Sequence, residues 1–447
     1  MPWFFLAAAF AGVLLHHGLA IDAFQKYGVT NSPLPKPFLA MPDSAAGNMP
    51  PLLSQTGTFE DVRTLKVKPG LIPYDLNVPF WSDGATKTRW IFAPSGITIL
   101  SGLGEDWSFS RGTVFVKHFD LATDETKPDF KRRLETRLLV LDATGGVYGV
   151  TYKWRTDNSD ADLLATNLTE SITVKTTSGV HTQSYYYPSR QDCLVCHTPL
   201  AGGVLGVKAR QLNRDFTYPS GTKANQLGAW NELQMFATKV SEKAIADCGQ
   251  LAMPSDTTHS VEDRARSYLD ANCGHCHRPG GTVASFDARY ATALREQNLI
   301  GATVLIDEGI DRARAIAPND IWRSIIYLRM SRLDGTKMPP LAHTELDRQG
   351  LALMREWIES LPGPRVLAPP EISPRGGDYK KSVAVTMKTA EAGVAIHFTL
   401  DGSVPTASDP IYKKPITVSG PTVFRAKAFK PGFTQSITAQ EVFIIGD

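Results

Sequence analysis

The pattern Cys-x-x-Cys-His occurs twice in this chain, and it constrains the fold more than any other feature of the sequence. The first copy runs from Cys193 to His197, and the second runs from Cys273 to His277. Each copy places two thiols about one helical turn apart and an imidazole directly after the second thiol. This is the attachment pattern of c-type haem, in which two cysteines add to the porphyrin vinyl groups and the histidine takes an axial position on iron. Two copies use four of the 5 cysteines, so the sequence predicts two covalently bound c-type haems.

The predicted haem-linked thiols are Cys193, Cys196, Cys273 and Cys276, and the predicted histidine ligands of iron are His197 and His277. A Cys-x-x-Cys pair can also be a redox dithiol or half of a zinc site. A redox dithiol would follow a strand in a βαβ unit, and no such pattern surrounds either copy. A zinc site with four ligands gives no reason for a histidine after both pairs. Haem attachment is therefore favoured over both alternatives.

Residues 259–363 carry further signals around the second motif. Ser260 and Asp263 are spaced as in a capping box, which predicts a helix that leads to Cys273. Met338 is followed by two prolines, and a thioether in such a stiff loop suits an axial iron ligand. A helix is predicted from Thr344 to the stop at Pro362-Gly363-Pro364. This order of elements resembles class I cytochrome c, and the resemblance implies a compact α domain with His277 and Met338 as axial ligands.

The first iron would need a sixth ligand or an open position. Residues 191–258 form the predicted first haem segment, and Met235 lies there within a stretch of helical spacing. Other candidates are Met253, Lys117, His118 and His181. An open position would allow the iron to react with small molecules, whereas a six-coordinate iron mainly transfers electrons.

The segment at 59–190 predicts a mostly antiparallel β domain. Short runs rich in β-branched and aromatic residues are separated by turn signals such as Thr144-Gly145-Gly146. The expected strands include 112–119, 134–141, 147–154 and 171–177. A Pro-rich linker is predicted before this domain, at 21–58.

After residue 364 the chain changes character, and strands are predicted at 382–386, 395–400 and 423–429 with a hairpin turn at Asp401-Gly402. The run from Phe398 to Thr406, with Tyr412 and Arg425 to Ala428, resembles the Ig-like module at the C-terminus of chitobiases and hexosaminidases. The resemblance implies a non-catalytic β-sandwich over 371–447 that holds a polysaccharide or a partner protein, or serves as a spacer. The predicted fold is thus multidomain, with an antiparallel β domain, an α-helical cytochrome c region carrying two haem motifs, and a C-terminal Ig-like β-sandwich.

Residues 1–20 contain no Lys, Arg, Asp or Glu and end in Gly18-Leu19-Ala20, which predicts a Sec-type signal peptide and a periplasmic or extracellular location. An N-terminal membrane anchor is the alternative. The formal net charge is +2 and no long basic run is present, so nucleic acid is not expected as a partner.

Residues 50–362 are similar to an uncharacterised family of exported bacterial dihaem c-type proteins. The similarity is carried by the segments 73–84, 112–119, 135–139, 187–190, 211–213 and 264–277. It implies an exported dihaem cytochrome that relays electrons to or from a periplasmic redox protein or dehydrogenase, and an electron carrier is favoured over a catalyst. One alternative is a haem enzyme that acts on peroxide or a nitrogen oxide at an open first haem. A second alternative is a cell-surface binding or scaffold protein that acts through the C-terminal module.

Overall fold

The computed structural model describes residues 23–446 except for 32–35, 95–98, 105 and 283–285. It divides the chain into two compact units. The first unit extends to Thr282 and adds Ala288–Ala291 and Pro339–Asp347, and the second contains Thr292–Met338 and Arg348–Asp447. The predicted signal peptide at 1–20 lies outside the described residues.

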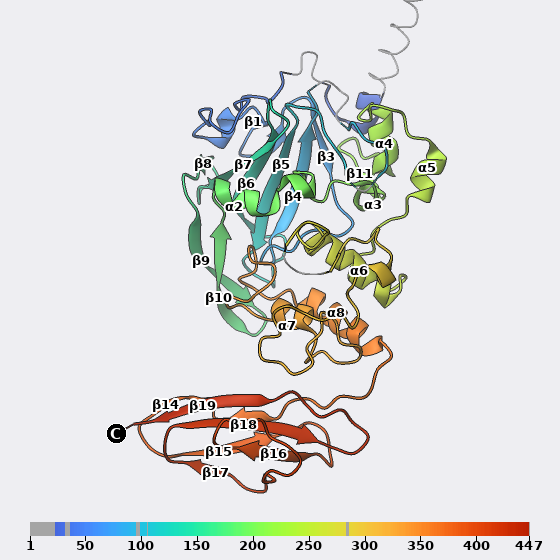
Figure 1. Cartoon of the computed structure of the whole chain (residues 1–447). Coiled ribbons are helices and arrows are strands. Elements are labelled where there is room, and N and C mark those ends of the chain that lie inside the picture. Colours follow the sequence, from blue (N-terminus) through green and yellow to red (C-terminus); the bar gives the residue numbers. More distant parts are fainter. Residues whose placement is uncertain (1–22, 32–35, 95–98, 105, 283–285, 447) are drawn as a thin grey trace, which may run out of the picture. The chain divides into compact units, whose positions relative to one another are not determined.

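A six-stranded antiparallel sheet forms the framework of the first unit, with the strands in sequence order across the sheet (Figure 1). Its strands are β3 (Leu71–Tyr74), β4 (Thr86–Phe92), β5 (Val114–Ala122), β6 (Lys131–Leu141), β7 (Val147–Trp154) and β8 (Ala161–Leu163). The strands predicted at 112–119, 134–141 and 147–154 correspond to β5, β6 and β7. β6 and β7 are joined by the turn at Thr144-Gly145-Gly146, as the turn signal there predicts.

The two faces of this sheet carry different residues, because side chains alternate along a strand. One face, with Trp90, Val116, Leu138 and Tyr152, belongs to a wholly apolar core. On the other face, Ile91, Phe115 and Leu139 join a second core to which the helix α4 (Gln226–Glu232) contributes Trp230. Both faces are therefore covered, and the strands are buried along most of their length.

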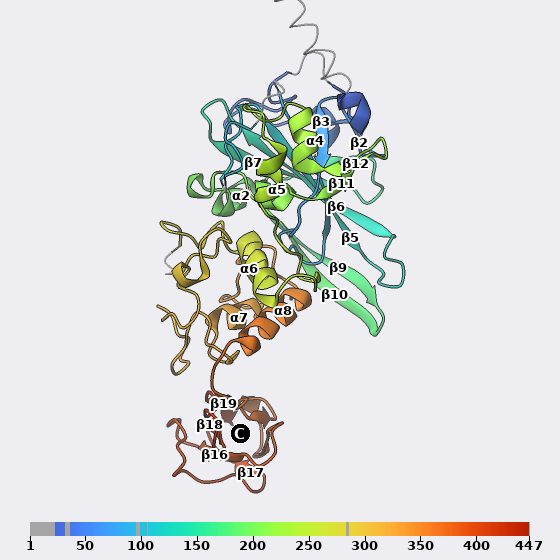
Figure 2. The ribbon, with the colours of Figure 1, turned by 90° about the vertical axis from the view of Figure 1, so that its right-hand side faces the viewer.

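A separate hairpin of β9 (Leu168–Thr176) and β10 (Gly179–Tyr187) lies beside β5 and β6 (Figure 2). Its buried side chains, among them Ile172, Tyr185 and Tyr187, pack against Phe119 and Leu134 of the sheet. The first unit also contains two short two-stranded sheets, β1 (Phe59–Asp61) with β2 (Lys66–Val67) and β11 (Asp215–Thr217) with β12 (Lys223–Asn225).

Helices of the first unit begin where the sequence places capping residues. In α2 (Arg190–Cys196) the Ser189 hydroxyl accepts the Asp192 N–H, and the Asp192 carboxylate accepts the Ser189 N–H, which is a complete capping box. In α6 (Val261–Asn272) Ser260 caps the first turn by accepting the Asp263 N–H. The remaining helices are α3 (Ala209–Leu212), α5 (Glu242–Asp247) and the 3₁₀ turns η1 (Leu53–Gln55) and η2 (Pro199–Ala201).

The predicted linker at 21–58 contributes to the cores of the first unit. Tyr27 is 1% exposed and belongs to the core that contains Trp230. Met41 and Leu53 belong to the core on the opposite face of the sheet. A Pro-rich segment is therefore ordered here by packing apolar side chains between its prolines.

The second unit combines two helices with a β-sandwich. The helices are α7 (Ile325–Met330) and α8 (Arg348–Ser360), preceded by the 3₁₀ turn η3 (Leu294–Glu296). The sandwich has one sheet in the order β13-β15-β17 and another in the order β14-β19-β18-β16, drawn in orange to red in Figure 1. Its strands are β13 (Glu371–Ser373), β14 (Gly377–Tyr379), β15 (Val383–Lys388), β16 (Ala395–Thr399), β17 (Ile416–Val418), β18 (Thr422–Phe429) and β19 (Ala439–Ile445).

The prediction of a multidomain, mostly β chain with a C-terminal β domain is confirmed. The α-helical cytochrome c region is not supported, because α6 belongs to the first unit whereas α7 and α8 belong to the second. One contact that holds α6 in the first unit joins it to the β domain, where Asn272 Oδ1 accepts the Trp81 N–H at 2.8 Å. The last helix begins at Arg348 rather than Thr344, because the Thr344 N–H donates to Asp83 instead.

Within the described residues, every helix is too short or too polar to span a bilayer.

Candidate functional site

The two Cys-x-x-Cys-His motifs lie in the same unit, and each lies at the C-terminal end of a helix. Cys193 and Cys196 are on α2, and His197 is the residue at which that helix ends. Cys273 is the corresponding end residue of α6, and its N–H donates to the Leu269 carbonyl at 2.8 Å. Cys276 follows in the turn after α6. The helix predicted to lead to Cys273 is thus confirmed.

The structure brings the second cysteines of the two motifs together. The side chains of Cys196 and Cys276 are in hydrogen-bonding contact, and both are free thiols. The contact raises the pKa of Cys196 and lowers the pKa of Cys276, which also accepts a hydrogen bond from His275. Cys276 is therefore the more acidic of the two thiols.

The first cysteines of the motifs are more deeply buried. Burial raises the pKa of Cys193, and it raises the pKa of Cys273 to about 12. Both thiols therefore remain protonated at neutral pH, and low intrinsic reactivity is expected of them.

The two motif histidines have different surroundings. The His197 Nδ1–H donates to the Gly203 carbonyl at 2.7 Å, which leaves Nε2 as the unprotonated nitrogen. Burial and the charge of Lys117 lower the pKa of His197 to about 3, so this imidazole is neutral throughout the physiological range. His277 Nδ1 lies 3.4 Å from the Thr282 hydroxyl, and its carbonyl accepts the Ala288 N–H.

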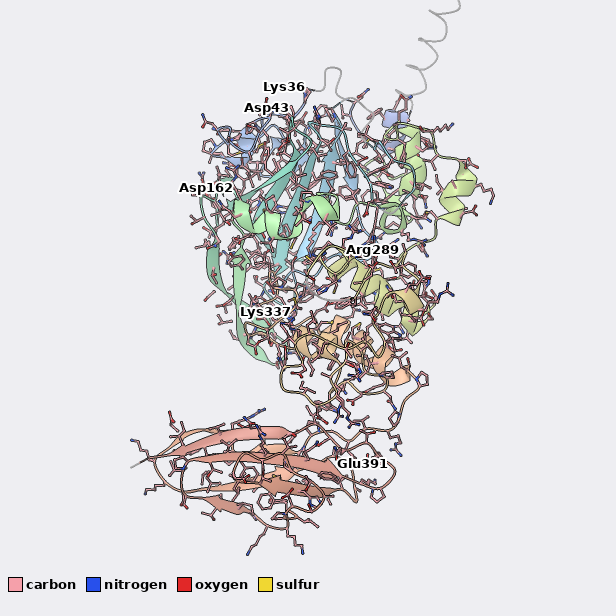
Figure 3. The ribbon with its side chains drawn as sticks, viewed as in Figure 1. Lys36, Asp43, Asp162, Arg289, Lys337 and Glu391 are labelled. Atoms are coloured by element: carbon pink, nitrogen blue, oxygen red, sulfur yellow. The ribbon has the colours of Figure 1, made fainter. Side chains whose placement is uncertain are left out.

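The first motif lines a cavity of the first unit with Cys193, Cys196 and His197, and the second motif contributes only Gly274 and His275 to its wall. The cavity has a volume of about 190 Å³, and its floor is the sheet face that carries Lys117 and Arg137. Figure 1 shows α2 crossing in front of this sheet. Aromatic and aliphatic side chains make up much of the remaining wall, among them Phe80, Phe115, Phe119, Trp107, Leu76 and Val207. Arg289, labelled in Figure 3, is a further cation at the wall. The cavity therefore combines an apolar wall with a cationic floor.

Gly149 of β7 allows α2 to lie this close to the sheet. A Cβ at this position would be 2.7 Å from Cys193 Sγ and 2.8 Å from Cys193 Cβ. We expect Gly149→Ala to displace α2 and to destabilise the first unit by about 1–3 kcal/mol, because both obstructing atoms are close to the helix backbone. Urea unfolding followed by tryptophan fluorescence measures this loss, with Gly221→Ala as the comparison.

Gly221 tests the specificity of that effect. A Cβ there would meet no atom within 4 Å, so any loss comes from its positive φ of 86° alone. A destabilisation by Gly149→Ala that is no larger than that by Gly221→Ala would contradict the close packing of α2.

Neither methionine predicted as an iron ligand is among the residues that line this cavity. Met235 is 1% exposed in the apolar core around Trp230, and it is not among the residues that line the cavity. Met338 belongs to the second unit, where it lies in a loop and its N–H donates to the Arg329 carbonyl at 3.0 Å. Of the other candidates, Met253 is 43% exposed at the surface.

Two of the remaining candidates already have polar partners. His118 is completely buried, with Nδ1 2.8 Å from the Thr136 hydroxyl and Nε2 3.2 Å from Asp120. His181 Nε2 lies 2.9 Å from the Glu345 carboxylate. Lys117 alone among the candidates for the sixth ligand lies in the cavity wall with the first motif.

The interpretation of the chain as a metal-binding haem cytochrome is wrong on two findings. The framework is made of strands with few helices, and the described residues contain no group of three or more His, Cys, Asp or Glu side chains that could hold a metal ion. Nothing in the fold or in the comparisons below supports the predicted electron relay. Covalent attachment of haem at the four cysteines is a separate expectation that no contact in the described residues tests, and it stays a prediction.

Sequence reasoning missed the cationic floor of the cavity. The signal was the placement of Lys117 between Phe115 and Phe119. Every second side chain of a strand lies on the same face, so a lysine between two phenylalanines at this spacing shares their buried face. Similar alternation surrounds Arg89 and Arg137. Strand register was needed to show that these three cations are neighbours.

The C-terminal sandwich has a well-packed apolar core. Phe398 of β16 stacks on Phe424 of β18 with ring centroids 5.7 Å apart, and Phe424 meets Phe443 of β19 edge to face. Gly402 has a positive φ of 81°, as expected of the turn at Asp401-Gly402. The strands predicted at 382–386, 395–400 and 423–429 correspond to β15, β16 and β18.

Comparison with known proteins agrees with this sandwich. Among curated proteins, none matches the chain. No cytochrome c family profile matches it either. Residues 374–440 match the family described as chitobiase/beta-hexosaminidase C-terminal domain, which confirms the module that the sequence predicted at 371–447.

Proposed function

We propose that this chain is a cell-surface or extracellular binding protein that holds a carbohydrate through its C-terminal module. The observation that carries the proposal is the match of residues 374–440 to the chitobiase/beta-hexosaminidase C-terminal domain. The family description names chitobiase and beta-hexosaminidase as the enzymes that carry such a module. A polysaccharide that contains N-acetylhexosamine is therefore the ligand class to test first.

An open groove in the second unit supports this proposal. It has a volume of about 560 Å³, within the range of small-molecule sites, and is lined by Arg312, Ala395, Phe429, Lys430, Pro431, Phe433, Thr434 and Gln435. Phe429 and Phe433 supply apolar ring surface, against which the C–H face of a sugar ring can pack. The side chains of Thr434, Gln435 and Arg312 supply the hydrogen-bonding groups that sugar hydroxyls require.

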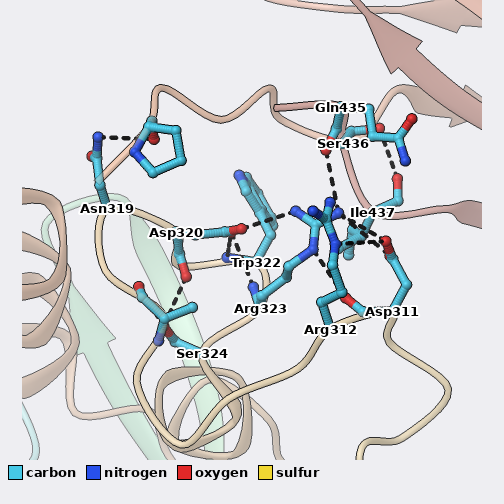
Figure 4. Close-up of polar contacts among 12 residues, drawn as sticks. Asp311, Arg312, Asn319, Asp320, Trp322, Arg323, Ser324, Gln435, Ser436 and Ile437 are labelled. Carbon is cyan, nitrogen blue, oxygen red and sulfur yellow. Dashed lines mark hydrogen bonds and ion pairs between the residues drawn. The ribbon is translucent and has the colours of Figure 1, made fainter. Parts of the chain in front are cut away.

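The rim of this groove is held by a network of charges. Arg323 donates to the Asp320 carboxylate at 2.8 Å, to Asp311 at 3.2 Å and to the Gln435 carbonyl at 3.2 Å (Figure 4). Arg323 is only 4% exposed at its side chain, so these bonds are shielded from water. The segment around Arg312 is thus attached to the sandwich beside the groove, and the groove is preformed.

Phe433 is the residue whose loss should weaken carbohydrate binding most. Its ring carries the Arg365 guanidinium 4.3 Å and the Lys430 ammonium 4.8 Å from its centroid, which fixes its position. We expect Phe433→Ala to reduce binding of the full chain to insoluble chitin at least fivefold, because ring contacts contribute about 1 kcal/mol each. Cosedimentation with chitin at increasing polysaccharide concentration measures the affinity.

Phe130→Ala provides the matched control. Phe130 is 69% exposed in the first unit, so its truncation removes an aromatic ring from the surface without touching the groove. Equal binding by Phe433→Ala and Phe130→Ala would contradict the groove as the binding place. Failure of the wild-type chain to bind chitin would refute the carbohydrate assignment.

A further inference from the structure

Three cations lie directly opposite one another across the central sheet. The register pairs Arg89 of β4 with Lys117 of β5, and Lys117 with Arg137 of β6. Residues directly opposite in antiparallel strands point to the same face. Like charges in such positions repel each other and oppose folding. The first unit therefore carries three mutually repelling positive charges on the sheet face that lines the cavity.

The outer members of this row have counterions and the middle one does not. Arg89 donates to the Asp75 carboxylate at 2.6 Å, and Arg137 donates to both oxygens of Glu135 at 2.9 and 2.5 Å. No hydrogen bond or ion pair to the Lys117 ammonium is found among the described residues. The Lys117 ammonium at the centre of the row is thus the one member that an anionic group inside the cavity could neutralise.

The carboxylates of the cavity lining already have partners of their own. Three Asp residues are in the lining. Asp106 binds Arg278 and Asp270 forms an ion pair with Lys208, both of them cations of the same lining, and Asp192 completes the cap of α2. Each of these carboxylates is therefore engaged by a group other than Lys117, as Asp75 and Glu135 are by Arg89 and Arg137.

The cavity also has an apolar side next to the row. Phe115 and Phe119 flank Lys117 on the same strand face, and Phe80 lies in the wall with its ring 5.5 Å from that of His275. The remaining lysine, Lys87, is already bound to the carbonyls of Phe80 and Ala85 at 2.7 and 3.2 Å. A ligand that fits this arrangement has one negative end and one apolar end.

We propose that this cavity binds a small organic carboxylate with an aromatic or aliphatic body. Its carboxylate accepts hydrogen bonds from Lys117 between Arg89 and Arg137, and its body lies against Phe115 and Phe119. The ligand supplies the counterion that the cationic row lacks, so its binding stabilises the first unit. This site lies in the first unit and is independent of the carbohydrate groove of the second.

Sodium benzoate is the probe, and benzamide, which has nearly the same shape and no charge, is its neutral counterpart. Both are titrated into the full wild-type chain by isothermal titration calorimetry, with the thermal unfolding midpoint as a second readout. We expect benzoate to bind and to raise the midpoint, and benzamide to bind at least tenfold more weakly. Equal affinity for the two compounds, or no binding of benzoate, would overturn the proposal without any variant being needed.

Lys117→Met then locates the carboxylate. We expect this variant to bind benzoate at least tenfold more weakly, whereas Lys153→Met binds it as the wild type does. Lys153 is a partly buried lysine of the same sheet that pairs with Glu170 and lies outside the cavity lining, so it matches the substitution chemically. Benzoate affinity that is unchanged in Lys117→Met, with circular dichroism showing a native fold, would rule out the assigned position.

Discussion

Replacing Glu135 with Gln is expected to destabilise the first unit by about 3 kcal/mol. The Glu135 side chain is completely buried and binds three donors, the Arg137 Nε–H and Nη2–H and the Tyr185 hydroxyl at 2.7 Å. Burial alone would lower the pKa of Arg137, but the charge and hydrogen bonds of Glu135 outweigh it and raise that pKa. Without the carboxylate, Arg137 remains charged beside Lys117 with no counterion. Urea unfolding at pH 7 measures the loss.

Two further variants separate the buried ion pair from a general effect of losing a carboxylate. Glu170→Gln removes a carboxylate that is 27% exposed and pairs with Arg132 at 2.6 Å, and we expect a smaller loss than for Glu135→Gln because solvent partly screens this pair. The double variant Glu135→Gln/Arg137→Met removes both charges and should recover most of the stability, because a neutral pair carries no buried charge. A Glu135→Gln variant no less stable than Glu170→Gln would contradict the role of Glu135 as the counterion of Arg137.

Lys117→Met is expected to stabilise the protein at neutral pH, with a gain that shrinks as the pH rises. Burial, followed by the charges of Arg89 and Arg137, lowers the pKa of Lys117 from 10.5 to about 7 in the folded state. Between these two values the unfolded chain binds more protons than the folded chain, so wild-type stability rises with pH from about 7 to 10.5. Below pH 7 the wild type carries the full cost of a buried ammonium, on the order of 3–5 kcal/mol. The variant lacks that cost at every pH.

The measurement is the difference in unfolding free energy between variant and wild type at pH 7 and pH 9, without added carboxylate. In this difference, the contribution of tyrosine titration to the unfolding free energy cancels, because both proteins contain the same tyrosines. The other groups that face Lys117 are Lys87, Arg89, Arg137, Glu135, Cys193 and His197. His197, with a pKa of about 3, stays neutral across this range. A difference that is constant between the two pH values would show that Lys117 is not desolvated. If Lys117→Met is more stable than the wild type and yet loses benzoate binding, Lys117 serves ligand binding and not the stability of the fold.

Much of the β framework was predictable from local pattern. Residues 147–154 alternate aromatic and branched side chains between clear turns, and β7 has those bounds. The sandwich strands and the turn at Asp401-Gly402 carry equally local signals. Helix starts were predictable where a side chain caps them, as at Ser260, because a cap involves residues within one turn. The last helix was predicted too early because Thr344 donates its N–H to Asp83, a partner 261 positions away.

The candidate site was predictable only in part. The sequence pointed to both motifs and to their histidines, and the structure places the first motif and the segment between the two cysteines of the second in the wall of one cavity. The prediction of a helical cytochrome c region was not supported, because the order of short elements along the chain does not determine which unit each element joins. Asn272 and Trp81, whose contact attaches α6 to the β domain, are 191 positions apart.

Most strands, turns and caps were predictable because the period of apolar side chains, the turn residues and the capping residues are properties of neighbouring residues. The C-terminal module was predictable too, because its signals lie close together in the chain. The contact of Cys196 with Cys276 and the row of Arg89, Lys117 and Arg137 over a cavity could be recognised only in the folded chain. These arrangements depend on strand register and on the packing of α2 against Gly149, in which residues distant in the chain become neighbours. A shift of register by one residue would turn Lys117 to the other face of the sheet and would remove the cationic row.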